Sequence, residues 1–340
     1  MALRVLQVGL GGWGRDWAQH VIPAVPEVDL VGYVDSDPSA LGRLKDAMKV
    51  PPDRCFQSLE RAIEATKPEA VVVTATLAGH APVTRAALGA GLHVLVEKPF
   101  VETLDVAREL VALAAAQHKV LMVSQNYRFF PASRKVAQLV SESRLGKLHE
   151  VSIDFRRYSP GSATGPARHH LDDQPLLSDM SIHHFDLLRF ILGHEPERLY
   201  CEAWNPAWSA FSGPSVAVAA IDFPGEIVVS YRGSWNSKGP ITPWAGEWRM
   251  DFEHGHIFWT SRGDDGIKAD RVVIQKPDRK PDATPLTPLA RIDRWGTLTE
   301  FALAVQKGRE PECSGRDNLG TLAMVAAAID SAAQGQPVAL

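Results

Sequence analysis

The sequence predicts an α/β protein with two domains, a doubly wound parallel sheet followed by an α+β domain with a large open, mostly antiparallel sheet. In the first third of the chain, short runs of apolar and β-branched residues alternate with segments of helical spacing. Buried parallel strands joined by helical crossovers have this pattern. After about residue 126, the runs alternate apolar with polar residues, as strands do when one face contacts water. A length of 340 residues suits two cores, because one core rarely exceeds roughly 250–300 residues.

The first domain is predicted to span residues 1–125. Its parallel strands are expected where short apolar runs occur. These runs are Leu3–Val8, Val28–Val34, Ala70–Thr74, His93–Val96 and Val120–Val123. Its helices are expected between them, where apolar residues recur at helical spacing. These segments are Trp13–Val25, Pro38–Met48, Leu59–Ala65, Ala81–Ala90 and Leu104–Gln117.

The second domain is predicted to span residues 126–340. Val151, Ile153 and Phe155 fall on one face of a predicted strand and alternate with polar residues, which gives one buried and one solvated face. The segments expected in its sheet are Leu148–Arg157, Leu199–Trp204, Ser215–Phe223, Ile227–Trp235, Trp248–Trp259 and Arg271–Gln275. The expected helices are Leu177–Leu188, Leu298–Gln306 and Leu319–Ala333, and Lys276–Thr287 is expected to be a solvated loop.

Composition and charge argue against several classes of protein. Apolar residues make up 45% and charged residues 22% of the chain, close to the average for soluble globular domains. A net charge of −4 with no long basic run argues against nucleic acid and against an anionic membrane as partners. No apolar run is long enough to cross a bilayer. The three cysteines are odd in number and widely spaced, so we expect neither disulfides nor a metal knuckle, and a cytoplasmic location.

A glycine-rich turn follows the first predicted strand and opens the first predicted helix, which is the context that a dinucleotide-binding fingerprint requires. Its residues are Gly9, Leu10, Gly11, Gly12, Trp13 and Gly14. Glycines here permit a tight turn and let the backbone approach a pyrophosphate, while the helix N-terminus supplies N–H groups and a partial positive charge. The alternative is a turn that binds nothing. The strand, the helix and a following acid together favour a Rossmann-type cofactor site.

Asp35 ends the second predicted strand, 21 residues after Gly14. A carboxylate at this place can accept hydrogen bonds from the ribose hydroxyls of adenosine and repels a 2′-phosphate. Ser36, rather than an arginine, follows it. The sequence therefore predicts NAD as the cofactor in preference to NADP, with Asp35 and Ser36 in the cofactor site.

An acid and a base, Glu97 and Lys98, stand at the carboxyl end of the fourth predicted strand, directly before Pro99. Ligands of open α/β sheets bind at this edge. Lys98 is therefore expected to reach cofactor and substrate, and Glu97 to border the cofactor. A proline in such a tight turn is a candidate for the cis peptide form. The alternative is a surface ion pair at the end of a strand.

The predicted helix Leu177–Leu188, with Ser178 as its N-cap, is apolar around most of its circumference and is expected to be buried. Asp179 and His183 are one turn apart on it, and Asp186 follows on the same face. A histidine beside carboxylates is oriented and kept basic, which suits a proton acceptor that also contacts substrate. The alternative is a core histidine bonded to Asp179. We expect no metal, because a third ligand at matching spacing is missing.

Further polar residues near these elements are weaker candidates, and each has a structural alternative. On the cofactor side they are Thr74, Thr76, His80 and Asn126. On the substrate side they are Arg128, Arg168, His169, His184 and Trp235. His184 points about 100° away from His183 on a helical wheel, so it is either a second wall of the pocket or a structural group.

Taken together, these residues resemble the Gfo/Idh/MocA oxidoreductase family, and the resemblance covers essentially the whole chain. The motifs that carry it are the N-terminal glycines, Gly91 through Lys98-Pro99, Asn126-Tyr127-Arg128-Phe129, Asp179 with His183 and Asp186, and Ser314–Gly335. One departure concerns the loop before the buried helix and the helix itself. Relatives often have glycines there, whereas this chain has Gln174-Pro175 and Ser181.

The resemblance implies an NAD-dependent dehydrogenase that acts on a CH–OH group of a sugar, cyclitol or related polyol. It implies that Lys98 hydrogen-bonds the reacting oxygen, that His183 is the general acid/base and that Asp179 orients it. It also implies that the open sheet of the second domain buries one face against another subunit. A homodimer or homotetramer is therefore expected.

Two other functions stay open at this point. Some relatives use tightly held NAD⁺ for a transient oxidation during glycoside cleavage, and others bind NAD and sense ligands without turnover. A sensor could dispense with Lys98, Asp179 and His183, which this chain retains. A hydride-transferring enzyme is therefore favoured, although the fold alone does not decide between these functions.

Overall fold

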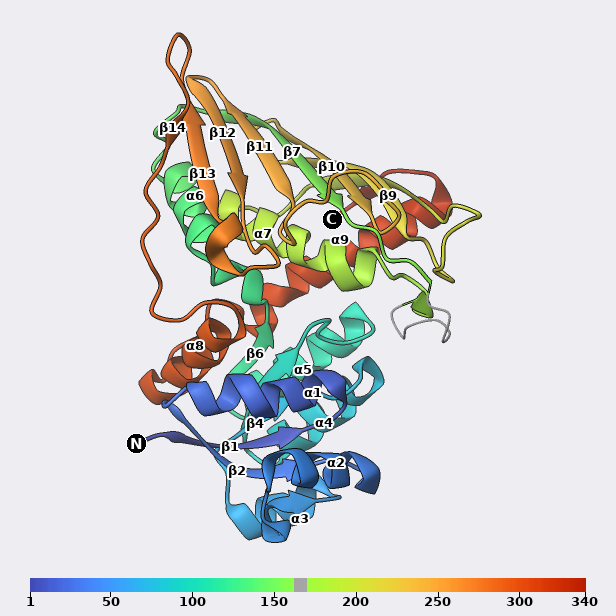
Figure 1. Cartoon of the computed structure of the whole chain (residues 1–340), viewed down its shortest axis with the longest axis vertical. Coiled ribbons are helices and arrows are strands. Elements are labelled where there is room, and N and C mark those ends of the chain that lie inside the picture. The colour runs from blue at the N-terminus through green and yellow to red at the C-terminus, as the bar shows by residue number, and fades with distance from the viewer. Residues whose placement is uncertain (162–169) are drawn as a thin grey trace. The chain divides into compact units, whose positions relative to one another are not determined.

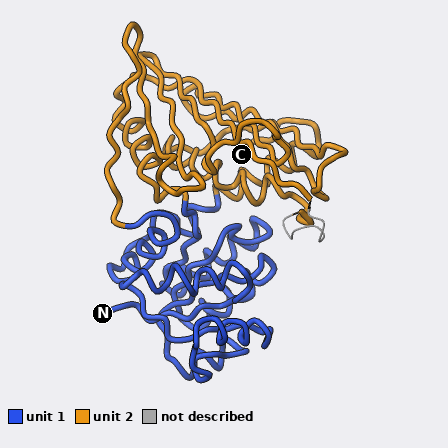
Figure 2. Tube along the Cα trace, viewed as in Figure 1, with its two compact units in different colours: residues 1–126, 291–319 blue, residues 127–290, 320–340 orange. Residues whose placement is uncertain are grey.

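The computed structural model describes residues 1–161 and 170–340, whose contacts divide the chain into two units (Figures 1 and 2). Unit 1 comprises Met1–Asn126 and Arg291–Leu319, and unit 2 comprises Tyr127–Ala290 and Gly320–Leu340. The first division falls next to the boundary expected at residue 125. The structure differs from the expected second domain at Arg291–Leu319, because helix α8 (Asp293–Lys307) packs on strands of unit 1.

Unit 1 is built on a parallel sheet of six strands in the order β3-β2-β1-β4-β5-β6. The strands are β1 (Leu3–Val8), β2 (Val28–Val34), β3 (Cys55–Phe56), β4 (Ala70–Val73), β5 (His93–Glu97) and β6 (Leu121–Ser124). The predicted doubly wound class is confirmed. The strand order reverses between β1 and β4, and sheets of this kind bind ligands outside the carboxyl ends of the strands at such a point.

Helices join the strands of unit 1 in turn. They are α1 (Gly12–Asp16), α2 (Pro38–Met48), α3 (Leu59–Thr66), α4 (Leu77–Gly89) and α5 (Leu104–Ala116). The side chains of Asp37, Ser58 and Thr103 accept hydrogen bonds from the first turns of α2, α3 and α5, which stabilises those helix starts. Helix α4 begins before the predicted Ala81, because Pro82 stands inside it and resembles a helix start in the sequence.

Unit 2 contains a sheet of nine strands in the order β14-β13-β12-β11-β7-β10-β9-β8-β15. The strands are β7 (Leu148–Arg156), β8 (Arg198–Trp204), β9 (Val216–Phe223), β10 (Ile227–Ser234), β11 (Glu247–Phe252), β12 (Gly255–Thr260), β13 (Arg271–Gln275), β14 (Asp282–Ala283) and β15 (Val338–Ala339). Strands β7 and β10 run parallel, and the other described neighbours run antiparallel, as expected. The predicted segment Trp248–Trp259 is a hairpin, and β14 lies within the predicted loop Lys276–Thr287.

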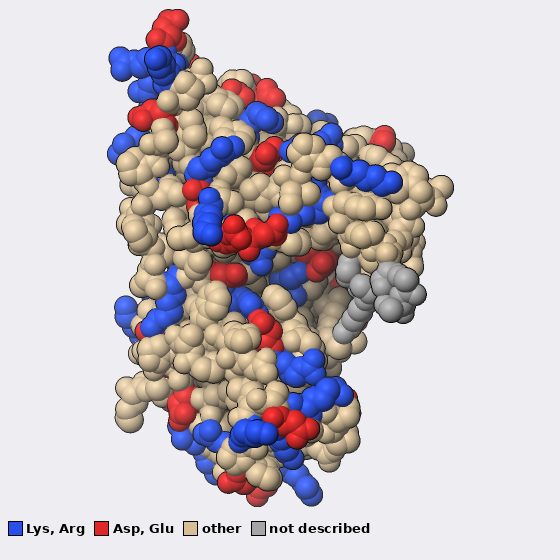
Figure 3. Space-filling view, viewed as in Figure 1, with Lys and Arg blue, Asp and Glu red and all other residues tan. Residues whose placement is uncertain are grey.

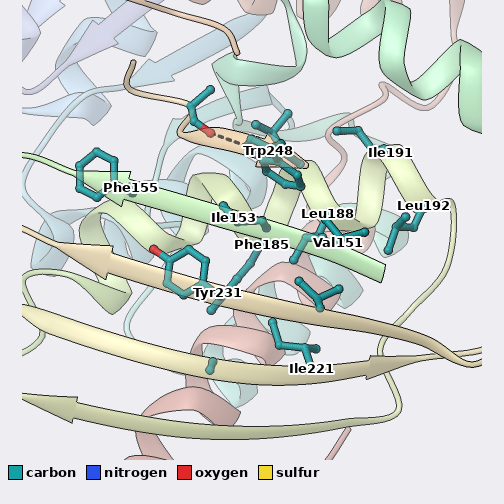
Figure 4. Close-up of a cluster of buried hydrophobic side chains, with 14 of the residues drawn as sticks. Val151, Ile153, Phe155, Phe185, Leu188, Ile191, Leu192, Ile221, Tyr231 and Trp248 are labelled. Atoms are coloured by element: carbon teal, nitrogen blue, oxygen red, sulfur yellow. Dashed lines mark hydrogen bonds between the residues drawn. The ribbon is translucent and has the colours of Figure 1, made fainter. Parts of the chain in front are cut away.

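Helices α6 (Pro131–Ser141), α7 (Ile182–Leu192) and α9 (Gly315–Gln334) lie on one side of this sheet (Figure 1). Figure 4 shows Val151 and Ile153 of β7 among the apolar side chains of α7, including Phe185 and Leu188. All four are buried, which confirms the inward face predicted for this strand. Helix α6 was not predicted.

Helix α7 is preceded by a π-helical turn, Leu177–Ser181. The N–H of Ser181 donates to the carbonyl of Leu176, five residues earlier, at 2.8 Å. The predicted N-cap at Ser178 is wrong, because Leu176 stands at that position and no side chain caps the turn. A π turn holds one more residue than an α turn, so a regular helical wheel misplaces the side chains before His183 relative to those after it.

Charged groups are evenly mixed on the surface that Figure 3 shows. Lys and Arg side chains lie among Asp and Glu side chains, without a large area of one sign. This mixture agrees with the small net charge of −4. None of the described helices is long and apolar enough to span a bilayer.

Candidate functional site

The glycine-rich turn of unit 1 connects β1 to α1. At two of its positions, neighbouring backbone atoms of the protein leave no space for a Cβ. Gly9 has a φ of +93°, and a Cβ there would lie 2.4 Å from the backbone of Ala75. A Cβ on Gly14 would lie 2.0 Å from the carbonyl oxygen of Gly9. Both distances are far below van der Waals contact. Glycine at position 9 therefore lets the turn lie against the backbone after β4, and glycine at position 14 lets α1 pack on the turn.

The two glycines between them face open space. A Cβ on Gly11 or on Gly12 would meet no atom within 4 Å, and both residues are exposed. Gly11 is the N-cap of α1, and the first N–H groups of a helix have no acceptor within the helix. Bare backbone, unpaired donors and open space are what a pyrophosphate needs, so the residues present fit the phosphates of NAD.

A buried glutamine that sequence reasoning missed holds this turn in place. Gln7 of β1 donates from Nε2 to the Gly14 carbonyl at 2.6 Å and to Thr74 Oγ1 at 2.9 Å. Thr74 donates in turn to the Gly9 carbonyl at 2.7 Å. Gln7 is fully buried, and a polar residue inside an apolar strand was the available signal. The hydrogen bonds of Thr74 therefore stabilise the turn.

Asp35 lies just after β2 and contacts the same turn. One carboxylate oxygen accepts a hydrogen bond from the N–H of Leu10 at 2.6 Å, and the other accepts from the N–H of Asp37 at 2.9 Å. The acid therefore joins the glycine-rich turn to the start of α2. Ser36 beside it is exposed, as is Trp13 in the turn.

Glu97 and Lys98 follow one another at the carboxyl end of β5, and their surroundings differ. Glu97 is buried, and its carboxylate accepts from the indole N–H of Trp17 at 2.8 Å and from the N–H of Lys98 at 3.1 Å. Lys98 is half-buried, and the peptide bond to Pro99 is cis, as expected for this turn. Glu97 thus fixes the backbone from which the Lys98 side chain projects.

Two more of the predicted cofactor residues bond to other groups of the protein. The buried imidazole of His80 lies 2.8 Å from the Pro99 carbonyl and 3.2 Å from the Ala75 carbonyl, and so links the two turns. Asn126 is buried and donates to the carboxylate of Asp293 at the start of α8. Thr76 is exposed at the N-cap of α4. A direct contact of these three residues with the cofactor stays a prediction.

In unit 2, His183 is the second residue of α7 and is only 5% exposed. Its imidazole stacks on the ring of Tyr127, with 4.0 Å between centroids and 1° between planes. Asp179 lies in the π turn before the helix and is partly exposed. Its predicted action on His183 stays a prediction.

Arg128 and Asp186 pair with one another inside unit 2. The guanidinium donates to both carboxylate oxygens, from Nε at 2.7 Å and from Nη2 at 2.6 Å. Thr321 of α9 also donates to this carboxylate, at 3.1 Å. The two charged side chains are only 4% and 1% exposed. This pair gives Arg128 a structural role, and its predicted contact with substrate stays a prediction.

His184 belongs to a buried hydrogen-bond chain. Its Nε2 lies 3.0 Å from the Trp244 carbonyl and its Nδ1 lies 3.1 Å from the Tyr231 hydroxyl, which is 2.8 Å from the hydroxyl of Ser181. Since the carbonyl only accepts, Nε2 carries the proton and Tyr231 donates to Nδ1. Burial lowers the pKa of His184 to about 4 and raises that of Tyr231. A neutral, fully bonded imidazole is structural, so we do not retain it in the substrate site.

Trp235 is also part of the core. Its indole N–H donates to the Pro175 carbonyl at 3.1 Å, and its ring meets the ring of Phe155 edge-on at 5.1 Å. It is 7% exposed. The predicted substrate residues Arg168 and His169 lie outside the residues that the structure describes.

Comparison with protein families finds two matches that lie next to one another in the chain. Residues 3–125 match an oxidoreductase family with an NAD-binding Rossmann fold. Residues 133–257 match the GFO/IDH/MocA C-terminal domain. Together the two models cover most of the chain.

Known proteins resemble the chain along most of its length. D-apiose dehydrogenase from Paraburkholderia graminis is 26% identical over 98% of this chain and 88% of its own length. 1,5-Anhydro-D-fructose reductase from Ensifer adhaerens is 25% identical over 82% of both chains. The fold matches that of an oxidoreductase from Agrobacterium radiobacter, solved in complex with NAD⁺, L-tartaric acid and magnesium. Its TM-score is 0.87 at 21% identity, over 100% of this chain and 98% of that one.

Replacing Gly11 by alanine is expected to separate cofactor binding from folding. The backbone at Gly11 has a φ of −58°, which alanine adopts, and the added Cβ meets no protein atom. We expect the unfolding temperature without NAD to stay within about 1 °C, and the Kd for NAD to rise at least tenfold, about 1.4 kcal/mol, because Cβ enters the phosphate space. Differential scanning fluorimetry and isothermal titration calorimetry measure the two quantities.

Gly14→Ala is the matched control, because its Cβ would collide with the Gly9 carbonyl. It is expected to lower both the unfolding temperature and the affinity. Unchanged NAD affinity in Gly11→Ala would show that the turn does not hold the phosphates.

The buried His184 predicts a loss of stability in mild acid. Its pKa of about 4 in the folded protein lies below the ordinary value of 6.5, so the unfolded chain binds a proton first as the pH falls. The stability that His184 contributes is therefore present above pH 6.5 and is lost between pH 6.5 and 4. The wild type should lose about 2 kcal/mol more than His184→Gln between pH 7 and pH 5. Urea unfolding at the two pH values tests this, and equal losses would contradict it.

Proposed function

Because the chain belongs to the Gfo/Idh/MocA family of NAD-binding oxidoreductases, we propose that it transfers hydride between NAD(H) and a secondary hydroxyl or carbonyl group of a sugar, cyclitol or related polyol. The observation that carries the proposal lies within unit 1. The open phosphate cradle follows β1, and Lys98 follows β5, two places along the same parallel sheet. Carboxyl ends of parallel strands share one edge, so a cofactor anchor and a cationic side chain stand on the same side of the sheet.

Each catalytic role is assigned to one side chain. Bound NAD supplies the hydride acceptor or donor. The Lys98 ammonium stabilises negative charge on the reacting oxygen, a preorganised electrostatic role. His183 takes the hydroxyl proton during oxidation and returns it during reduction, and Asp179 orients its ring. All three assignments are proposals.

Asp35 is proposed to set the preference for NAD over NADP. Its carboxylate lies where the adenosine ribose binds in sheets of this class, and it is held there by the N–H of Leu10. A 2′-phosphate at this place would meet a fixed negative charge. Ser36 is proposed to lie beside the same ribose.

The substrate class follows from the relatives. The two curated proteins described above are named for D-apiose and 1,5-anhydro-D-fructose, which are both carbohydrates. We propose a carbohydrate or polyol for this chain as well. The competing functions, NAD-dependent glycoside cleavage and sensing without turnover, have different products and are separated by the first experiment below.

We also propose that the chain forms a homodimer or homotetramer through the open face of the nine-stranded sheet. Helices cover the other face, while the open face presents exposed apolar side chains, among them Val218 of β9 and Val228 of β10. Arg232 of β10 pairs with Asp154 of β7 on this face at 2.9 Å. Apolar groups mixed with paired charges suit a self-complementary, two-fold interface.

A cytoplasmic location is part of the same proposal. Cys55 and Cys201 are reduced thiols in the described structure. Thiols persist in this form in a reducing compartment.

Removing the proposed catalytic groups is expected to abolish hydride transfer without abolishing NAD binding. A panel of sugars, inositols and their keto forms is followed by NADH absorbance, with product analysis on the same samples. With the best substrate, Lys98→Ala should slow turnover by ~10²–10³ and His183→Ala by ~10²–10⁴. Lys307→Ala, an exposed lysine at the end of α8, is the matched control and should keep full activity.

Near-normal turnover in both active-site variants would refute the assignment. Release of free sugar without net NADH formation would identify a glycosidase instead. NAD binding without turnover of any compound in the panel would favour a sensor.

Replacing exposed valines on the open sheet face by glutamate is expected to dissociate the proposed oligomer. The variant Val218→Glu/Val228→Glu places two like charges on the face and should shift the mass found by light scattering towards that of one chain. Ile267→Glu is the control, because Ile267 is similarly exposed but lies in a short 3-10 turn outside the sheet. A wild type that is already monomeric, or an oligomer that survives the double substitution, would contradict the proposed interface.

A further inference from the structure

The proposed proton acceptor has an aromatic partner with no role assigned so far. The rings of Tyr127 and His183 are parallel to within 1°, their centroids are 4.0 Å apart, and both residues belong to unit 2. Tyr127 is 3% exposed and His183 is 5% exposed. The contact is therefore a buried, face-to-face stack between a phenol and an imidazole.

Tyr127 is itself held by a cation. Arg262 donates from Nη1 to the Tyr127 hydroxyl at 3.0 Å, and its guanidinium carbon lies 4.5 Å from the centre of the tyrosine ring. The backbone N–H of Arg262 donates to the carboxylate of Asp270, which also accepts from the N–H of Ala132 in α6. The tyrosine ring is thus fixed at its hydroxyl and near its face by a loop that is anchored to α6.

A second interaction joins the segment that contains Tyr127 to helix α7. Arg128, the residue after Tyr127, makes the bidentate ion pair with Asp186, one turn after His183 on α7. Charge-assisted pairs of this geometry are strong and directional. The stack and the ion pair therefore set both the separation of the two segments and the rotation of α7.

A proton acceptor needs this kind of restraint. The χ2 torsion of histidine is broad and roughly two-fold, so a free imidazole turns its nitrogens over a wide range of directions. General-base catalysis requires a nitrogen within hydrogen-bond reach of the reacting hydroxyl, and misplacement by about 1 Å can cost 10²-fold in rate. A parallel ring at 4.0 Å leaves the imidazole one plane in which to lie.

We propose that Tyr127 is a positioning residue for His183, whose ring fixes the imidazole plane, and that Arg262 holds Tyr127 in place. The proposal rests on the proposed function, because it requires His183 to be the proton acceptor. Tyr127 acts through His183 and does not itself carry the proton.

Tyr127→Leu and Tyr127→Phe test the proposal as a pair. Phenylalanine keeps the stacked ring and loses only the bond from Arg262, whereas leucine loses the ring. With the most active keto compound of the panel and NADH, Tyr127→Leu should lower kcat by about ten- to a hundredfold with KM within about twofold. Tyr127→Phe should keep at least about a third of the wild-type kcat. Stereospecifically deuterated [4-²H]NADH should give a larger isotope effect in Tyr127→Leu, because the chemical step becomes slower.

Phe129→Leu is the matched control for a general loss of packing. Phe129 is a buried aromatic residue two positions along, with the Arg134 guanidinium 4.9 Å from its ring centre. Its replacement should lower the unfolding temperature about as much as Tyr127→Leu and leave kcat and the isotope effect unchanged. If Tyr127→Leu does not fold, Arg262→Gln replaces it and should lower kcat several-fold, with KM unchanged.

The outcomes distinguish a failure of the positioning role of Tyr127 from a failure of the proposed function. Equal losses of kcat in Tyr127→Leu and Phe129→Leu, or full activity in Tyr127→Leu, would overturn the positioning role while His183→Ala still confirmed the proton acceptor. Full activity in His183→Ala would overturn the proposed function and the positioning role with it.

Discussion

Helix α7 is buried on nearly every side, so the polar groups that it carries must find partners inside unit 2. Asp186 is matched by the guanidinium of Arg128, and His184 by a tyrosine hydroxyl and a backbone carbonyl. Breaking a buried ion pair by removing one partner costs about 3–5 kcal/mol. These pairs therefore fix the rotation of the helix about its axis, and the direction of the His183 side chain depends on that rotation.

Five of the six strands of unit 1 were predicted nearly to the residue, because buried parallel strands are continuous apolar runs with clear ends. The two-residue strand β3 was not predicted, and other features escaped as well. The proline inside α4 concealed its beginning, α6 was not predicted, and Arg291–Leu319 was assigned to the wrong unit. The last of these depends on contacts between α8 and strands almost 200 residues earlier in the sequence. No local pattern contains that information.

In the candidate site, too, features formed by neighbouring residues were predictable, and contacts between distant residues were not. The tight turn that contains Gly9 and Gly14 was predicted from spacing, because that turn is local. The partners of Thr74, Glu97 and Asn126 could not be predicted, since each bond joins residues that are far apart in the sequence, up to 167 positions. A buried polar side chain can contact either a ligand or another part of the chain, and only the structure shows which protein groups it has already found.

The π turn at Leu177–Ser181 allows a one-residue deletion to change the position of Asp179 in the course of evolution. It is equivalent to one residue inserted into a helix. Loss of one residue from this segment would restore the regular α-helical repeat and rotate everything before it by about 100° relative to α7. Asp179 could thereby be moved around His183 by a single codon deletion, while the buried pairs of α7 stayed intact. Asp179 is thus an adjustable element that precedes a fixed helix.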